Sequence, residues 1–146
     1  MGAGSRGAQV RNVDGLGRHV IGELYGCDPA SLRDLEGIIE TVRRAAKEAG
    51  ATIVGDFANK YDKGEGVSYI LVVKESHISV HTWPELGYAA IDIYTCGEHV
   101  DPWKAFNVMA ESFSPKTVSV MEIKRGLMVK EAEEQQQVSI ALEKTG

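Results

Sequence analysis

The chain has 146 residues, which is the length of one ordinary domain and enough to bury a hydrophobic core. Its composition, 43% hydrophobic and 25% charged, is typical of a globular protein in water, and no run of about 18 apolar residues predicts a membrane helix. The net charge is −5 and the 16 Lys and Arg residues are spread along the chain, a pattern that argues against a nucleic-acid partner.

The first residues show none of the usual targeting signals. Residues 1–15 are Gly-rich and polar, so we expect a disordered extension and no secretory signal peptide. The Met-Gly start would suit myristoylation, but Arg6 stands where that motif requires Ser or Thr. Two cysteines, Cys27 and Cys96, are too few for a disulfide framework. We therefore expect a cytoplasmic protein.

Two helices are predicted, each beginning at an Asp-Pro pair. Asp28 suits a helix N-cap and Pro29 the first helical position, and one apolar face then continues to Gly50, a residue typical of helix ends. Asp101 and Pro102 repeat this signal before a second stripe of apolar residues at helical spacing.

Six strands are predicted, and short links join the middle ones. They are expected over residues 17–25, 51–57, 67–74, 78–83, 88–95 and 117–123, with a polar loop over 58–66. Short links favour antiparallel pairing, and helices on one face of one sheet are the simplest way to bury the apolar faces. The predicted fold is an α+β two-layer sandwich, with one largely antiparallel sheet and two helices on one face. This domain spans 16–127, and a polar tail follows over 128–146.

Residues that could perform chemistry gather between positions 68 and 96. A metal site built from His77, His81 and Cys96 is one interpretation, but residues four apart on a strand lie roughly 13 Å apart, too far to share one ion. A hydrolase with Cys96 as its nucleophile is another, without a local sequence signature to support it. A third is purely structural, with hydrogen-bonded histidines on a strand and a small buried thiol.

The same stretch also resembles a known family. The segment from Gly66 to Phe106 contains ESHISVHTWPE and YTCG, and it is flanked by GRHVIGELYGCD near the start and MEIKRG near the end. In these motifs and their spacing the chain is similar to the prokaryotic-type S-adenosylmethionine decarboxylase family over roughly residues 16–127. That family depends on a pyruvoyl group and includes an arginine decarboxylase branch.

The resemblance implies that the chain cuts itself between Glu75 and Ser76, giving fragments 1–75 and 76–146. In the family, the serine hydroxyl attacks the preceding carbonyl to form an ester, and elimination then leaves a pyruvoyl group at the position of Ser76. This group binds the substrate amine as a Schiff base and accepts electrons as carbon dioxide leaves, without a metal or pyridoxal phosphate.

The resemblance also assigns roles to three other residues. His81 matches the processing base, Ser68 matches a serine that assists processing, and Cys96 matches the donor that returns a proton to the substrate. Ser76 and His81 have opposite parity on one strand, so a straight strand would place them on opposite faces. We therefore predict a break in the extended backbone near Ser76.

Glu85 and Trp83 match substrate-binding positions, a carboxylate for the ribose hydroxyls and a ring for the base or sulfonium. In the loop before the strand of Ser68, Asp62 occupies a place where many family members have an aromatic residue, and Tyr61 is the nearest ring. An acidic loop would suit the guanidinium of arginine as well as a sulfonium. The MEIKRG ending favours adenosylmethionine, whose decarboxylated product is the aminopropyl donor for spermidine in polyamine biosynthesis.

Two further implications concern partners. The resemblance implies a homodimer of processed two-chain protomers, with its sites at or near the interface. A non-catalytic, unprocessed partner subunit is an alternative of another class. Such a chain would usually lack Ser76, His81 or Cys96, and all three are present.

Overall fold

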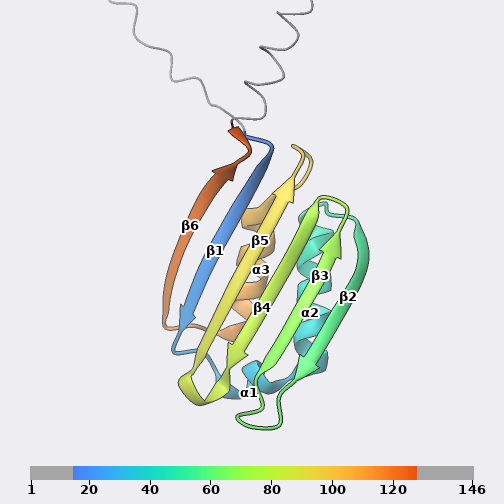
Figure 1. Ribbon diagram of the computed structural model, residues 1–146. Coiled ribbons are helices and arrows are strands. Elements are labelled where there is room, and N and C mark those ends of the chain that lie inside the picture. The colour runs from blue at the N-terminus through green and yellow to red at the C-terminus, as the bar shows by residue number, and fades with distance from the viewer. Residues whose placement is uncertain (1–14, 128–146) are drawn as a thin grey trace, which may run out of the picture.

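A computed structural model describes residues 15–127 as one α+β sandwich (Figure 1). Its six strands form one antiparallel sheet in the order β2-β3-β4-β5-β1-β6. The strands are β1 (Gly17–Tyr25), β2 (Ile53–Lys60), β3 (Val67–Val73), β4 (Ser76–Trp83), β5 (Tyr88–Cys96) and β6 (Thr117–Arg125). The predicted fold class is confirmed. The predicted extension, apart from Gly15, and the predicted tail lie outside the described residues.

The helices cover one face of the sheet, as predicted, and both longer ones lie behind it in Figure 1. They are α1 (Pro29–Arg33), α2 (Leu35–Glu48) and α3 (Pro102–Phe113), and a short 3₁₀ turn, η1 (Pro84–Leu86), joins β4 to β5. The prediction of one unbroken helix from Asp28 to Gly50 is wrong at Asp34. This residue leaves the helical conformation, and its carboxylate accepts the Gly37 N–H, so it caps a new helix. Within residues 15–127 no helix is long and apolar enough to cross a membrane.

The core lies between the helices and the sheet. Fully buried side chains from every layer meet there, including Leu24, Val42, Leu71, Ile91 and Met109. On β3, buried residues alternate with more exposed ones, so every second side chain points away from the helices. Cross-strand partners share a face, which fixes the orientation of residues on the neighbouring strands as well.

Five of the six strands start or end one to three residues from their predicted bounds, and the shifts in β2 and β4 bear on the site. β2 continues to Lys60, which pairs with Val67, so the predicted loop over 58–66 shrinks to residues 61–66. β4 begins at Ser76, which pairs with both Val73 and Thr95. Cross-strand pairing supplies the hydrogen bonds that extend both strands, and single-sequence patterns do not report it.

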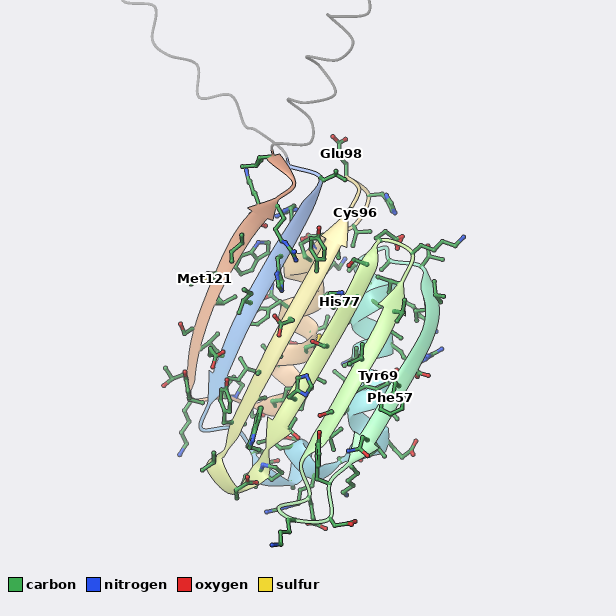
Figure 2. The ribbon with its side chains drawn as sticks, viewed as in Figure 1. Phe57, Tyr69, His77, Cys96, Glu98 and Met121 are labelled. Atoms are coloured by element: carbon green, nitrogen blue, oxygen red, sulfur yellow. The ribbon has the colours of Figure 1, made fainter. Side chains whose placement is uncertain are left out.

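We call the sheet surface away from the helices the open face, and Figure 2 views it directly. Its apolar side chains include Phe57 and Ile70, which pair with each other, and Met121 on β6. Phe57 is 68% exposed and Met121 is 58% exposed, and they lie toward opposite edges of the sheet (Figure 2). The open face is therefore a broad surface that mixes apolar side chains with the residues of the predicted site.

Candidate functional site

The predicted cleavage site lies in the tight turn between β3 and β4, at the upper end of the sheet in Figure 1. Ser76 has a φ of 142°, a conformation that residues with a side chain rarely adopt. The predicted break in extended geometry at Ser76 is therefore confirmed. Strain of this kind costs on the order of 1–3 kcal/mol and is held by the surrounding contacts.

The side chain of Glu75 anchors this turn. The residue is 6% exposed, and its Oε1 accepts the backbone N–H of Thr52 at 2.7 Å. Its Oε2 lies 3.5 Å from Nε2 of His99. The Thr52 hydrogen bond, with help from His99, lowers the pKa of the Glu75 carboxyl below its usual value despite burial. The ionised carboxylate thus ties the β3–β4 turn to the start of β2.

The backbone carbonyl of Glu75 faces two donors from one residue. Its oxygen accepts the N–H of Cys96 at 2.8 Å and the thiol of Cys96 at 3.1 Å. The register of β4 and β5 causes this contact, because it pairs Ser76 with Thr95 and brings the end of β5 beside the turn. Two donors on one carbonyl oxygen are the arrangement that stabilises an oxyanion when a nucleophile attacks.

The Ser76 hydroxyl is next to a histidine of its own chain. Its Oγ lies 3.2 Å from Nδ1 of His77, the following residue, whose ring packs edge-on against Tyr94. The prediction gave His77 no role beyond the rejected metal site. The one sequence signal for His77 was its position directly after Ser76. A side chain can reach that of the preceding residue when the backbone between them departs from extended geometry, as it does at Ser76.

Ser68 and His81 form a second cluster, on the open face toward the other end of β4. They are cross-strand partners, with Ser68 Oγ 2.8 Å from Nδ1 of His81. Ser68 Oγ also lies 3.2 Å from the hydroxyl of Tyr61. The sequence predicted that Ser68 and His81 act together, and the structure brings them together. Tyr61 joins them from the loop over 61–66.

These two clusters are far apart within one chain. Ser76 and His81 lie five positions apart on β4, which is about 16 Å at about 3.3 Å per residue. Glu75, Ser76 and Cys96 meet at one end, and Ser68 meets His81 at the other. The structure therefore does not bring the predicted base to the predicted nucleophile within a single protomer.

The substrate-binding residues predicted from the sequence lie beside the second cluster. A cavity of about 420 Å³ opens there between the 61–66 loop, β4 and η1, and its wall includes Tyr61, Asp62, Ser68, His81, Trp83 and Glu85. The loop is held by an ion pair between Arg33 and Glu65, 3.3 Å apart. Lys63 also lines this cavity, but the two carboxylates of the wall outnumber that one cation, and together with two aromatic rings they can bind an organic cation.

Metal-ligating residues do not cluster in the described part of the chain. Within residues 15–127 no three His, Cys, Asp or Glu side chains are placed to hold one ion. His77 contacts Ser76, and His81 contacts Ser68, so the two histidines of the metal-site interpretation lie in separate clusters.

A strained serine preceded by a carbonyl with two donors defines a class of site, one suited to attack of a serine hydroxyl on its own upstream peptide bond. The comparisons with known proteins show the family. The family model described as S-adenosylmethionine decarboxylase matches residues 18–126, and the chain belongs to this family.

Named relatives lie close in sequence and in structure. The S-adenosylmethionine decarboxylase proenzyme of Carboxydothermus hydrogenoformans is 48% identical over 128 residues, covering 88% of this chain and all of that protein. The proenzyme of Pelotomaculum thermopropionicum is 48% identical over 113 residues, covering 77% of this chain and 89% of that protein. The crystal structure of the adenosylmethionine decarboxylase from Aquifex aeolicus has a TM-score of 0.72 and 32% identity, covering 77% of this chain and 92% of that one.

Proposed function

We propose that this protein is a self-processing, pyruvoyl-dependent decarboxylase of S-adenosylmethionine. It supplies the aminopropyl donor for spermidine synthesis in the cytoplasm. The observation that carries the proposal is the pair of Cys96 donors on the Glu75 carbonyl, directly before the strained Ser76. The names of its relatives support the substrate, because they are S-adenosylmethionine decarboxylase proenzymes.

Self-processing needs a nucleophile, an oxyanion site and a base. Ser76 supplies the hydroxyl, and its oxygen attacks the Glu75 carbonyl carbon. The Cys96 N–H and thiol stabilise the charge that develops on the carbonyl oxygen. His81, held by Ser68, serves in the processing reaction, and the anchored Glu75 side chain keeps the turn in place.

The residues around position 76 fit a pyruvoyl group, which would act as the electron sink of the decarboxylation. Thr95 is 1% exposed, and its Oγ1 has no hydrogen-bond partner among residues 15–127. The Cys96 N–H bond to the Glu75 carbonyl makes Ser76 and Thr95 a non-hydrogen-bonded pair, a kind whose Cα atoms lie about 4.5 Å apart. A free hydroxyl is thus available beside the new carbonyl group. The adjacent Cys96 thiol is placed to return a proton to the substrate.

A homodimer completes the site. One protomer holds Ser76 in the turn at one end of the sheet, with Cys96 beside it, and holds Ser68 and His81 on the open face toward the other end. If two open faces pack against each other around a twofold axis, opposite ends of the two protomers meet. His81 of one chain can then face Ser76 of the other. The exposed apolar side chains of the open face, such as Phe57 and Met121, give this contact a hydrophobic surface.

The cavity beside His81 is the proposed substrate pocket. Trp83 offers a ring for the adenine or the sulfonium, and Glu85 offers a carboxylate for the ribose hydroxyls. Asp62 adds a second carboxylate at the cavity wall. In the proposed dimer this pocket opens toward the partner's Ser76. One chain then binds the substrate, and the other chain supplies the reactive group.

Cleavage and substrate are tested together. Intact-mass analysis of the purified protein should give fragments 1–75 and 76–146, the second without a free amino terminus, whereas Ser76→Ala should remain one chain of 15.9 kDa. The processed protein should release carbon dioxide from labelled adenosylmethionine and not from arginine. An uncut wild-type chain would contradict self-processing. Carbon dioxide release from arginine alone would show that the protein is an arginine decarboxylase instead.

A further inference from the structure

The first proton transfer of self-processing needs a base that touches the Ser76 hydroxyl. The chain has four histidines, all within residues 15–127. His81 lies about 16 Å along β4 from Ser76. His19 is bonded to Asp92 at 2.9 Å.

His99 contacts the Glu75 side chain and not the hydroxyl. His77 is the histidine in hydrogen-bond contact with Ser76 Oγ, at 3.2 Å.

Resting on the proposed function, we propose that His77 is a catalytic residue of self-processing, the base that activates the Ser76 hydroxyl. When the ring proton is on Nε2, Nδ1 is free to accept the hydroxyl proton. The ring is positioned by its edge-on contact with Tyr94, with centroids 5.9 Å apart. His77 acts within its own chain, before any contribution from the partner.

The step balances as an N-to-O acyl shift. The Ser76 proton moves to His77 Nδ1 while Oγ bonds to the Glu75 carbonyl carbon. The π electrons move to the carbonyl oxygen, where the Cys96 N–H and thiol hold the charge. The carbonyl then re-forms as the C–N bond breaks. The electron pair of that bond goes to the Ser76 nitrogen, which takes the proton back from the imidazolium. An ester, a free amino group and a neutral His77 result.

This assignment gives the two proton transfers of self-processing to two different histidines, one after the other. The ester forms with His77 of the same chain. The later removal of the proton from Cα of residue 76 is left to His81, which in the proposed dimer arrives from the partner with Ser68 behind it. One imidazole does not have to serve both atoms. His77, the residue after Ser76, therefore gains a function that its half-buried position on a strand would not indicate.

The test uses two variants that keep a ring beside Tyr94. His77→Phe removes the nitrogen and preserves the aromatic contact. His19→Phe is the matched control, because His19 packs against the same Tyr94 at 5.6 Å from the other side and does not touch Ser76. We expect His77→Phe to cleave at least about 100-fold more slowly than wild type, the usual scale for loss of a general base. His19→Phe should cleave at the wild-type rate.

Hydroxylamine then identifies the step that is blocked, because it cuts esters and leaves peptide bonds intact. The uncut His77→Phe precursor should resist it, whereas the uncut His81→Ala precursor should be cut at position 75. Imidazole added to His77→Ala should restore part of the cleavage, which covers the case in which the phenylalanine variant folds poorly.

Three results would overturn the assignment of His77. The first is a His77→Phe cleavage rate within about threefold of wild type, which is far less than the usual effect of losing a general base. The second is an ester that accumulates in His77→Phe. The third is an uncut His81→Ala precursor that resists hydroxylamine. Failure of the proposed function is distinguishable from all three, because the wild-type chain itself would then stay whole.

Discussion

Cys96 contributes two donors of different kinds to one oxygen atom. Its backbone N–H is fixed by the β4–β5 register, whereas its thiol is a side-chain donor and a weak one. Substitution therefore removes one donor and leaves the other. The two proposed uses of the thiol, oxyanion stabilisation during processing and proton return during turnover, should respond differently to its loss.

For Cys96→Ala we expect cleavage to proceed about tenfold more slowly, less than the loss of about 10²–10³ seen when a strong oxyanion donor is removed, because the N–H remains. Steady-state carbon dioxide release by the cleaved variant should fall much further, since each turnover ends with the return of a proton and no thiol remains to supply it. A time course of chain cleavage on denaturing gels and carbon dioxide release measure the two effects. Cleavage that stops completely would show that the two roles assigned to Cys96 do not separate.

At the scale of the strands and helices, alternation and turn chemistry predicted most of the fold. The β1 bounds, the capped start of α3 and the helices on one face follow from periodic patterns and Asp-Pro signals. The split of the first helix at Asp34 was missed because the apolar face continues across it. Only the local competition of an Asp side chain for the Gly37 N–H reveals the break.

The candidate site was predictable in its members and less so in its arrangement. Simple strand arithmetic would have separated Ser76 from His81, as it separated His77 from His81 in the metal-site interpretation. The contact of Cys96 with the Glu75 carbonyl depends on the register of β4 against β5, and this register cannot be predicted from a single sequence. Thr52 reaches Glu75 from the segment just before β2, and no motif marks it.

The anchored β3–β4 turn predicts a pH-dependent stability. In the folded protein the pKa of the Glu75 carboxyl is lowered, chiefly by the hydrogen bond from the Thr52 N–H. The ionised carboxylate therefore stabilises the fold at every pH above 4.5, the usual pKa of a glutamate. This contribution is lost as the pH falls through the lowered pKa of Glu75. In the uncleavable Ser76→Ala background, Glu75→Gln should lower the melting temperature at pH 7. The difference in melting temperature between the two proteins should shrink as the pH falls below 4.5, since a protonated glutamate resembles glutamine.

Thermal melts between neutral and acid pH measure this difference directly. Glu98→Gln is a matched control, because Glu98 is an exposed glutamate in the loop that carries His99. It should leave the melting curves of the Ser76→Ala protein unchanged. A Glu75→Gln difference of equal size at every pH would contradict an anchoring role for the charge.

At the scale of the whole molecule, the open face accounts for the proposed division of the site between the two ends of one chain. Helices cover one side of the sheet, and the other side presents apolar residues beside both clusters. A twofold pairing of open faces would bury this surface and unite the clusters in the same step. Assembly and processing would then be coupled, because a chain without a partner would lack His81 at its cleavage site.

Mixed dimers distinguish this arrangement from a site built within one chain. A Ser76→Ala chain keeps a functional His81, and a His81→Ala chain keeps a functional Ser76, so neither should complete processing alone. When the two are co-expressed with different tags, the His81→Ala chain should be cut and the Ser76→Ala chain should stay whole, because each site takes its histidine from the partner. Replacing the Ser76→Ala chain by the double variant Ser76→Ala/His81→Ala removes that histidine and should abolish cleavage. If the first mixture also stayed whole although mixed dimers had formed, His81 would have to reach Ser76 within its own chain, and the open-face pairing proposed here would be wrong.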